Sequence, residues 1–105
     1  MLPKKFRLPI QKLPEKSSKN IRSPLVTIKV FSSDLGFPRF GVIISRKINK
    51  SAVKRNQLKR KFFLFAEEIF SKIKTADYLV IINKKEITAE ELEKELNSAF
   101  KSLNV

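Results

Sequence analysis

The residues with the clearest chemical potential are a run of cations and one amide in the stretch RFGVIISRKINKSAVKRNQLKRK, residues 39–61. Arg can grip a phosphate with two parallel hydrogen bonds, and Asn adds both a donor and an acceptor. Free backbone N–H groups at a helix start also attract anions. We therefore predict a site for a phosphate polymer, and its candidate residues are Arg46, Lys47, Lys50, Lys54, Arg55, Asn56, Lys59 and Arg60.

The second half of this stretch begins a helical pattern, which sets where the cations point. At about 100° per residue, Arg55, Lys59, Asn56 and Arg60 fall on one flank, and the apolar stripe falls elsewhere. The alternative to a binding site is a charged helix face that is simply exposed to solvent. Such a face normally carries Glu partners at i,i+4, and this cluster lacks them. Phe63 lies on the same flank, where it either stacks on a base or packs in the core.

The net charge supports a polyanion partner. The chain has 105 residues with 23 Lys and Arg against 10 Asp and Glu, a net charge of +13. Residues 1–61 hold 17 of the basic and 2 of the acidic side chains, so the excess is concentrated in the first part of the chain. Nucleic acid is the first candidate for the partner and an anionic membrane surface the second.

Composition also excludes several classes of enzyme. The chain has no His and no Cys, which removes thiol nucleophiles, His general bases and the usual zinc ligand sets. The carboxylates Glu67, Glu68 and those of residues 90–95 are better explained as charged helix faces than as a nuclease metal site. We therefore expect no catalytic and no metal-binding residue, no membrane span, no secretory signal, and a cytoplasmic protein.

The surrounding elements predict a small α+β sandwich. We expect strands at 25–31, 40–45 and 77–83, a long helix over 52–74 and a last helix starting at Thr88. A fourth strand would come from splitting one of these or from residues 29–38. Residues 1–22, with three prolines, are expected to form a basic arm with room for one short helix, and residues 23–105 a single RNA-binding domain.

Two blocks resemble the protein subunit of bacterial ribonuclease P. The first is Phe40 to Lys47, FGVIISRK, and the second is Ala52 to Arg60, AVKRNQLKR, which is similar to the family's Arg-Asn-Arg signature with Gln57 in the last Arg position. The start, LPKKFRL, and the run DYLVI at 77–81 add weaker likeness. Two departures are Phe63, where the family usually has another Arg, and the lack of a first-helix Phe.

The resemblance implies a ribosomal protein S5 domain 2-like fold. This is a mixed sheet of about four strands against two to three helices, with an unusual left-handed β-α-β crossover through the long central helix. It implies that the protein binds the catalytic RNA and holds the 5′ leader of precursor tRNA in a cleft between the sheet and the long helix. Our candidates for this leader cleft are Arg7, Phe40, Ser45 and Phe63. The resemblance places Ser45 at the strand end that borders the cleft and Arg7 in the basic N-terminal region, whereas Phe63 is a candidate because of its position on the helix flank.

The resemblance further implies a component of an endoribonuclease whose RNA performs the Mg²⁺-dependent cleavage. The protein itself would bind no cofactor or small-molecule substrate, and it would be a monomer in a 1:1 complex with the RNA. The rival hypothesis is a small ribosomal or other structural RNA-binding protein with no role in tRNA processing. It would have the same charge and the same dependence on salt.

Overall fold

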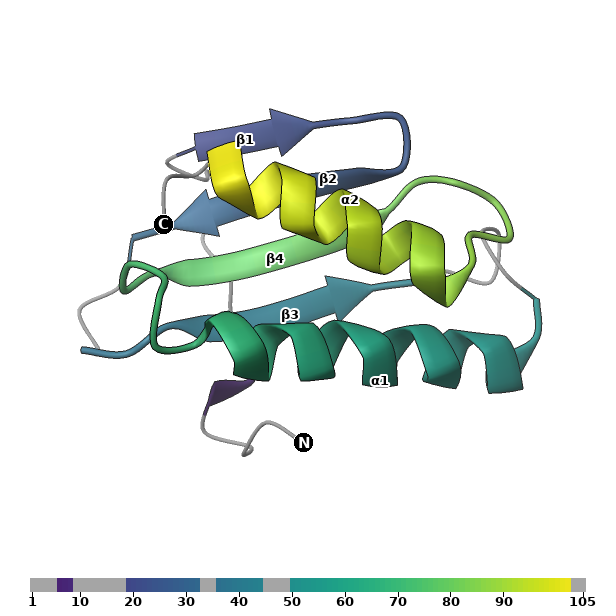
Figure 1. Cartoon of the computed structure of the whole chain (residues 1–105), viewed down its shortest axis with the longest axis horizontal. Coiled ribbons are helices and arrows are strands. Elements are labelled where there is room, and N and C mark those ends of the chain that lie inside the picture. The colour runs from purple at the N-terminus through teal and green to yellow at the C-terminus, as the bar shows by residue number, and fades with distance from the viewer. Residues whose placement is uncertain (1–5, 9–18, 33–35, 45–49, 103–105) are drawn as a thin grey trace.

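The computed structural model describes residues 6–8, 19–32, 36–44 and 50–102. Two helices lie on one face of a four-stranded sheet, which confirms the α+β sandwich (Figure 1). The elements in chain order are β1 (Lys19–Arg22), β2 (Val26–Phe31), β3 (Arg39–Ile43), α1 (Ala52–Ile69), β4 (Asp77–Ile82) and α2 (Ala89–Ser102). In this part of the chain, no helix is long and apolar enough to cross a bilayer.

The sheet is mixed, with the spatial order β1-β2-β4-β3. β2 pairs antiparallel with both β1 and β4, whereas β3 and β4 are parallel and joined through α1. With both helices in front of the sheet, the path from β3 through α1 to β4 is left-handed (Figure 1). This confirms the crossover implied by the resemblance, against the right-handed rule for such units.

Strand alternation divides the apolar side chains between two clusters. Tyr78, Val80 and Ile82 of β4 point toward the helices, and Leu79 packs on the opposite face with Leu8 and Phe31. The helices complete the larger cluster with the buried side chains Leu58, Phe62, Phe65, Ala66, Leu92, Leu96, Ala99 and Phe100. The main core therefore lies between the sheet and both helices.

Both helices start where the sequence predicts. Ser51 caps α1, because its side chain accepts a hydrogen bond of 3.2 Å from the Lys54 N–H. At α2, the Thr88 Oγ1 accepts from the Glu91 N–H at 3.1 Å, and the Glu91 carboxylate accepts from the Thr88 N–H at 3.0 Å. This reciprocal pair is the predicted capping box.

Two expectations need correction. α1 ends at Ile69 rather than at residue 74, although Ile73 beyond its end is still buried and so continues the apolar spacing. The fourth strand does not come from residues 29–38 or from a split strand; it is β1, inside the stretch assigned to the N-terminal arm. β1 was missed because it is a four-residue edge strand with Ile21 as its one apolar residue.

Candidate nucleic-acid interface

Five side chains from two distant parts of the chain line one surface groove of about 270 Å³. Four of them come from α1, at a spacing that places them on one flank of the helix. The fifth comes from the short N-terminal segment 6–8. We call this site the basic groove, and its lining residues are Arg7, Asn56, Lys59, Arg60 and Phe63.

The N-terminal segment reaches α1 because it extends the sheet. Arg7 forms a parallel bridge with Phe40 of β3, and the Leu8 N–H donates a hydrogen bond of 2.8 Å to the Phe40 carbonyl. Leu8 is buried against the helix-free face of the sheet. The groove therefore runs between α1 and the edge of the sheet beside β3.

Phe63 joins the groove to the core. Its ring packs against Phe62 with centroids 5.1 Å apart, and the Arg7 guanidinium lies 5.2 Å from its centroid on the groove side. Phe63 is partly buried and packs against the main core. The core packing expected of Phe63 is confirmed, and because the ring also lines the groove, its stacking on a base stays a prediction.

Arg55 is separated from the other cations of the predicted flank. It is partly buried at the start of α1, where its Nη1 donates to the Lys50 carbonyl at 3.1 Å. Lys50 and Lys54 are exposed, and Lys54 lines a different hollow, next to the loop before α2. The structure thus gathers Asn56, Lys59 and Arg60 but directs Arg55 toward the loop.

Phe40 is a correction to the predicted set. Its side chain is 0% exposed and stacks on Tyr78 at a centroid distance of 5.5 Å, because alternation along β3 turns it toward the helices. Its backbone, not its ring, serves the groove by positioning Arg7 and Leu8. Ser45, Arg46 and Lys47 lie outside the described residues.

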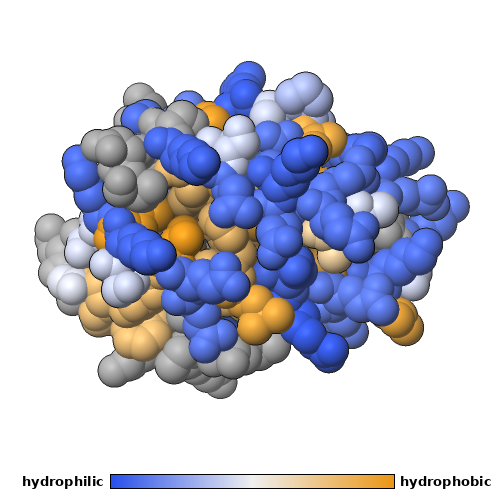
Figure 2. Space-filling model, in the orientation of Figure 1, coloured by the Kyte–Doolittle hydropathy of each residue, from blue (hydrophilic) through white to orange (hydrophobic). Residues whose placement is uncertain are grey.

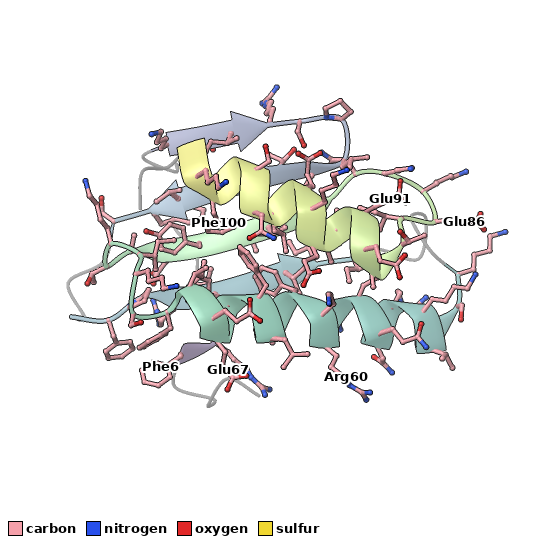
Figure 3. The ribbon with its side chains drawn as sticks, in the orientation of Figure 1. Phe6, Arg60, Glu67, Glu86, Glu91 and Phe100 are labelled. Carbon is pink, nitrogen blue, oxygen red and sulfur yellow. The ribbon has the colours of Figure 1, made fainter. Side chains whose placement is uncertain are left out.

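Two carboxylates of α2 pair with cations, one from α1 and one from the loop before α2. Lys61 of α1 lies 3.0 Å from Glu93 of α2, and Lys84 forms an ion pair with Glu91. Lys59 and Arg60, both exposed, form no ion pair with a carboxylate in the described part of the chain. Figure 3 shows the side chain of Arg60 pointing away from α1.

Three further rings lie together beside the N-terminal segment, and the predicted set of site residues includes none of them. The Phe6 ring lies 4.5 Å from the Phe70 centroid and 5.1 Å from the Phe37 centroid. All three rings are partly buried. We call Phe6, Phe37 and Phe70 the aromatic cluster. The one signal in the sequence that could have pointed to it is the seven-residue step from Phe63 to Phe70, which keeps the two rings on one flank of the helix.

No described residues form a metal site, since no three His, Cys, Asp or Glu side chains of the described ranges gather closely enough to hold an ion. The buried carboxylate of Asp77 is part of a structural pair. The Arg39 Nε and Nη2 donate to its two oxygens at 2.8 and 2.7 Å, which ties β3 to β4. These contacts raise the pKa of Arg39 through the hydrogen bond with Asp77.

The sequence and the structure of this chain are both similar to proteins of one family. The Ribonuclease P family matches residues 8–104. A relative described as "Ribonuclease P protein component", from Pseudanabaena sp. (strain PCC 6903), is 30% identical over 61 residues, which cover 57% of this chain and 53% of the relative. The match thus spans about half the length of that relative.

Solved structures agree on the fold. A Staphylococcus aureus RNase P protein mutant with defective mRNA degradation activity superimposes with a TM-score of 0.83 at 22% identity, covering 97% of this chain and 91% of that one. RNase P protein from Thermotoga maritima gives a TM-score of 0.77 at 21% identity, covering 94% and 98%. The chain belongs to the ribonuclease P protein family, as the resemblance in its sequence suggested.

Proposed function

We propose that this chain is the RNA-binding protein subunit of ribonuclease P. It binds the catalytic RNA and the 5′ leader of precursor tRNA, and it assists removal of the leader to give the mature 5′ end of tRNA. Cleavage is performed by the RNA with Mg²⁺, and one monomeric protein pairs with one RNA. The basic groove is the contact surface.

The observation that supports this proposal is the composition of the basic groove. Arg7, Lys59 and Arg60 supply cations, Asn56 supplies an amide, and Phe63 supplies a ring, all along one hollow. Cations position the sugar–phosphate backbone, an amide can hold a hydroxyl or a base edge, and a ring can stack on a base. A site that recognised only the backbone shape of an RNA duplex would not need an aromatic ring, because paired bases are not available for stacking.

The contribution of the protein to the reaction follows from these groups. The chain has no His and no Cys, so neither imidazole nor thiolate chemistry can be supplied by its side chains. Lys59 and Arg60 can instead neutralise phosphates of two RNA segments that would otherwise repel each other. Fewer Mg²⁺ ions are then needed to bring catalytic RNA and substrate together, which predicts that the protein matters most at low Mg²⁺.

The test is precursor tRNA cleavage by the cognate catalytic RNA at low Mg²⁺, with and without the protein. A double variant, Lys59→Ala with Arg60→Ala, removes two groove cations. Its matched control, Lys94→Ala with Lys101→Ala, removes the same charge from exposed positions of α2. We expect the natural protein and the control to accelerate cleavage strongly, and the groove variant to accelerate it far less.

Absence of acceleration by the natural protein would contradict the proposal. If the protein then still bound fragments of ribosomal RNA tightly, the rival hypothesis of a structural RNA-binding protein would take its place. Equal loss in the groove variant and the control would mean that only net charge matters.

A further inference from the structure

Arg7 differs from the other four residues of the basic groove, because they lie on α1 and it does not. A helix backbone fixes the direction in which its side chains leave it, whereas the place of Arg7 depends on what holds the segment 6–8. On one side of Arg7 the segment is attached to the sheet, since Leu8 is buried and its N–H donates to the Phe40 carbonyl at 2.8 Å. An attachment on the other side is needed to stop Arg7 from pivoting about Leu8.

Phe6 supplies this second attachment. Its ring lies 5.1 Å from the Phe37 centroid and 4.5 Å from the Phe70 centroid. Phe37 comes two residues before β3 begins, and Phe70 is the C-cap of α1, so Phe6 bridges the edge of the sheet and the end of the helix. Figure 3 shows Phe6 at that end of α1, where the surface in Figure 2 is apolar.

The contacts of Phe6 and Arg7 are made with the same flank of α1. Phe63 and Phe70 are seven residues apart, which places them on one flank and about 10 Å apart along the helix axis. Phe6 contacts Phe70, whereas the longer side chain of Arg7 extends to Phe63. With Phe6 held at the end of the helix, the Arg7 guanidinium is therefore directed back along α1 into the basic groove.

We propose that Phe6 and Phe70 are positioning residues for RNA binding, because their contact holds Arg7 in the basic groove before RNA arrives. This inference rests on the proposed function and adds two residues that do not line the groove. An Arg side chain has many rotamers, and ordering it in the free protein reduces the conformational entropy that is lost when RNA binds. Phe6 and Phe70 act through Arg7 and not by contact with the RNA.

A double-mutant cycle in RNA binding tests the inference. The affinity for the cognate catalytic RNA is measured for the natural protein, Phe6→Leu, Arg7→Ala and the double variant, all as the full chain. Phe6→Leu keeps apolar bulk but removes the ring, and we expect it to weaken binding by about two- to ten-fold. In the Arg7→Ala background the same change should have no further effect, because no guanidinium is left to position. Phe70→Leu should give the same result.

Two further variants separate positioning from a loss of stability. Phe6→Tyr keeps the ring at a partly buried position, so we expect it to bind RNA with the natural affinity. Phe100→Leu removes a buried ring that packs against Phe65 and Tyr78, away from the N-terminal segment. It should lower the urea midpoint and leave the RNA affinity of the folded protein unchanged. Equal losses of affinity in Phe6→Leu and Phe100→Leu would overturn the inference.

Hydrogen exchange at the Leu8 amide gives a readout that does not involve RNA. This amide is protected by its bond to the Phe40 carbonyl, so its exchange reports opening of the N-terminal segment. We expect Phe6→Leu to speed exchange at Leu8 and to leave the amide of Val80, in β4, unchanged. Equal exchange rates at Leu8 in the variant and the natural protein would mean that Phe6 does not hold the segment.

The binding data also show which of the two proposals fails. If the natural protein does not bind the catalytic RNA, both proposals fail. If Arg7→Ala weakens binding and Phe6→Leu weakens the Arg7→Ala variant further by its full factor, the groove stands and the aromatic cluster only packs. An Arg7→Ala variant with the natural affinity would also overturn the inference, since no contribution of Arg7 would remain to be positioned.

Discussion

The guanidinium of Arg7 lies 5.2 Å from the centroid of the Phe63 ring, and these two residues, which are far apart in sequence, both line the basic groove. The contact joins the N-terminal segment, held on β3 by the Phe40 carbonyl, to the flank of α1. The groove therefore exists only when the sheet edge and the helix are both in place.

A double-mutant cycle should detect this contact in the free protein. Arg7→Ala, Phe63→Leu and the double variant are compared by their free energies of unfolding in urea. Because the pair is partly exposed, we expect a coupling energy of about 0.5–1 kcal/mol. Strictly additive effects would mean that the two side chains do not stabilise each other.

The core assignment of α1 predicts opposite outcomes at two neighbouring residues. Phe65 is buried between α1 and α2, with its ring 5.4 Å from that of Phe100, so Phe65→Ala should lower the free energy of unfolding by roughly 3–5 kcal/mol. Leu64 is 47% exposed, and Leu64→Ala should change it by no more than about 0.5 kcal/mol. Similar losses in both variants would show that the buried stripe of α1 is misplaced.

The capping box predicts a dependence of stability on acid pH. Hydrogen bonds from the Lys84 ammonium and from the Thr88 N–H hold the pKa of Glu91 below its ordinary value of 4.5. A lowered pKa in the folded state means that the stabilisation is complete above the unfolded value and is lost as the pH falls through the folded value. The Glu91→Gln variant should therefore have a lower urea midpoint than the natural protein at neutral pH.

The same difference in urea midpoint should shrink as the pH is taken below about 4.5. Glu90, the exposed neighbour in the first turn of α2, gives the matched control Glu90→Gln. A gap between the natural protein and Glu91→Gln that stays constant across this range would mean that the ion pair and the cap contribute no pH-dependent stability.

Local signals in the sequence predicted the elements well. Ser51 and the pair Thr88 and Glu91 fixed both helix starts, because capping depends on residues close in sequence. β1 could not be predicted this way, since a short polar edge strand is held by its pairing with β2 and not by its own pattern. The end of α1 was also missed, because Ile73 kept the apolar spacing after the helical hydrogen bonds had ended.

The site was predicted only in part, for a similar reason. The helical wheel correctly put Asn56, Lys59 and Arg60 together, since one helix positions all three. The wheel also placed Arg55 with them. The Arg55 side chain instead donates a hydrogen bond to the Lys50 carbonyl, and helical periodicity cannot predict such a contact with the preceding loop. The meeting of Arg7 with Phe63 and of Phe6 with Phe70 depends on the pairing of the N-terminal segment with β3, which is a property of the tertiary fold.

The measurement that most directly tests the account is the affinity of the protein for its cognate catalytic RNA over a series of salt concentrations. Arg60→Ala should weaken binding by about 1–3 kcal/mol at low salt and lower the salt slope by about one unit, with the unfolding midpoint unchanged. Lys94→Ala, which removes one exposed charge from α2, should leave affinity and slope close to those of the natural protein. Equal affinities for Arg60→Ala and the natural protein at low salt, or a natural affinity that does not respond to salt, would contradict the account.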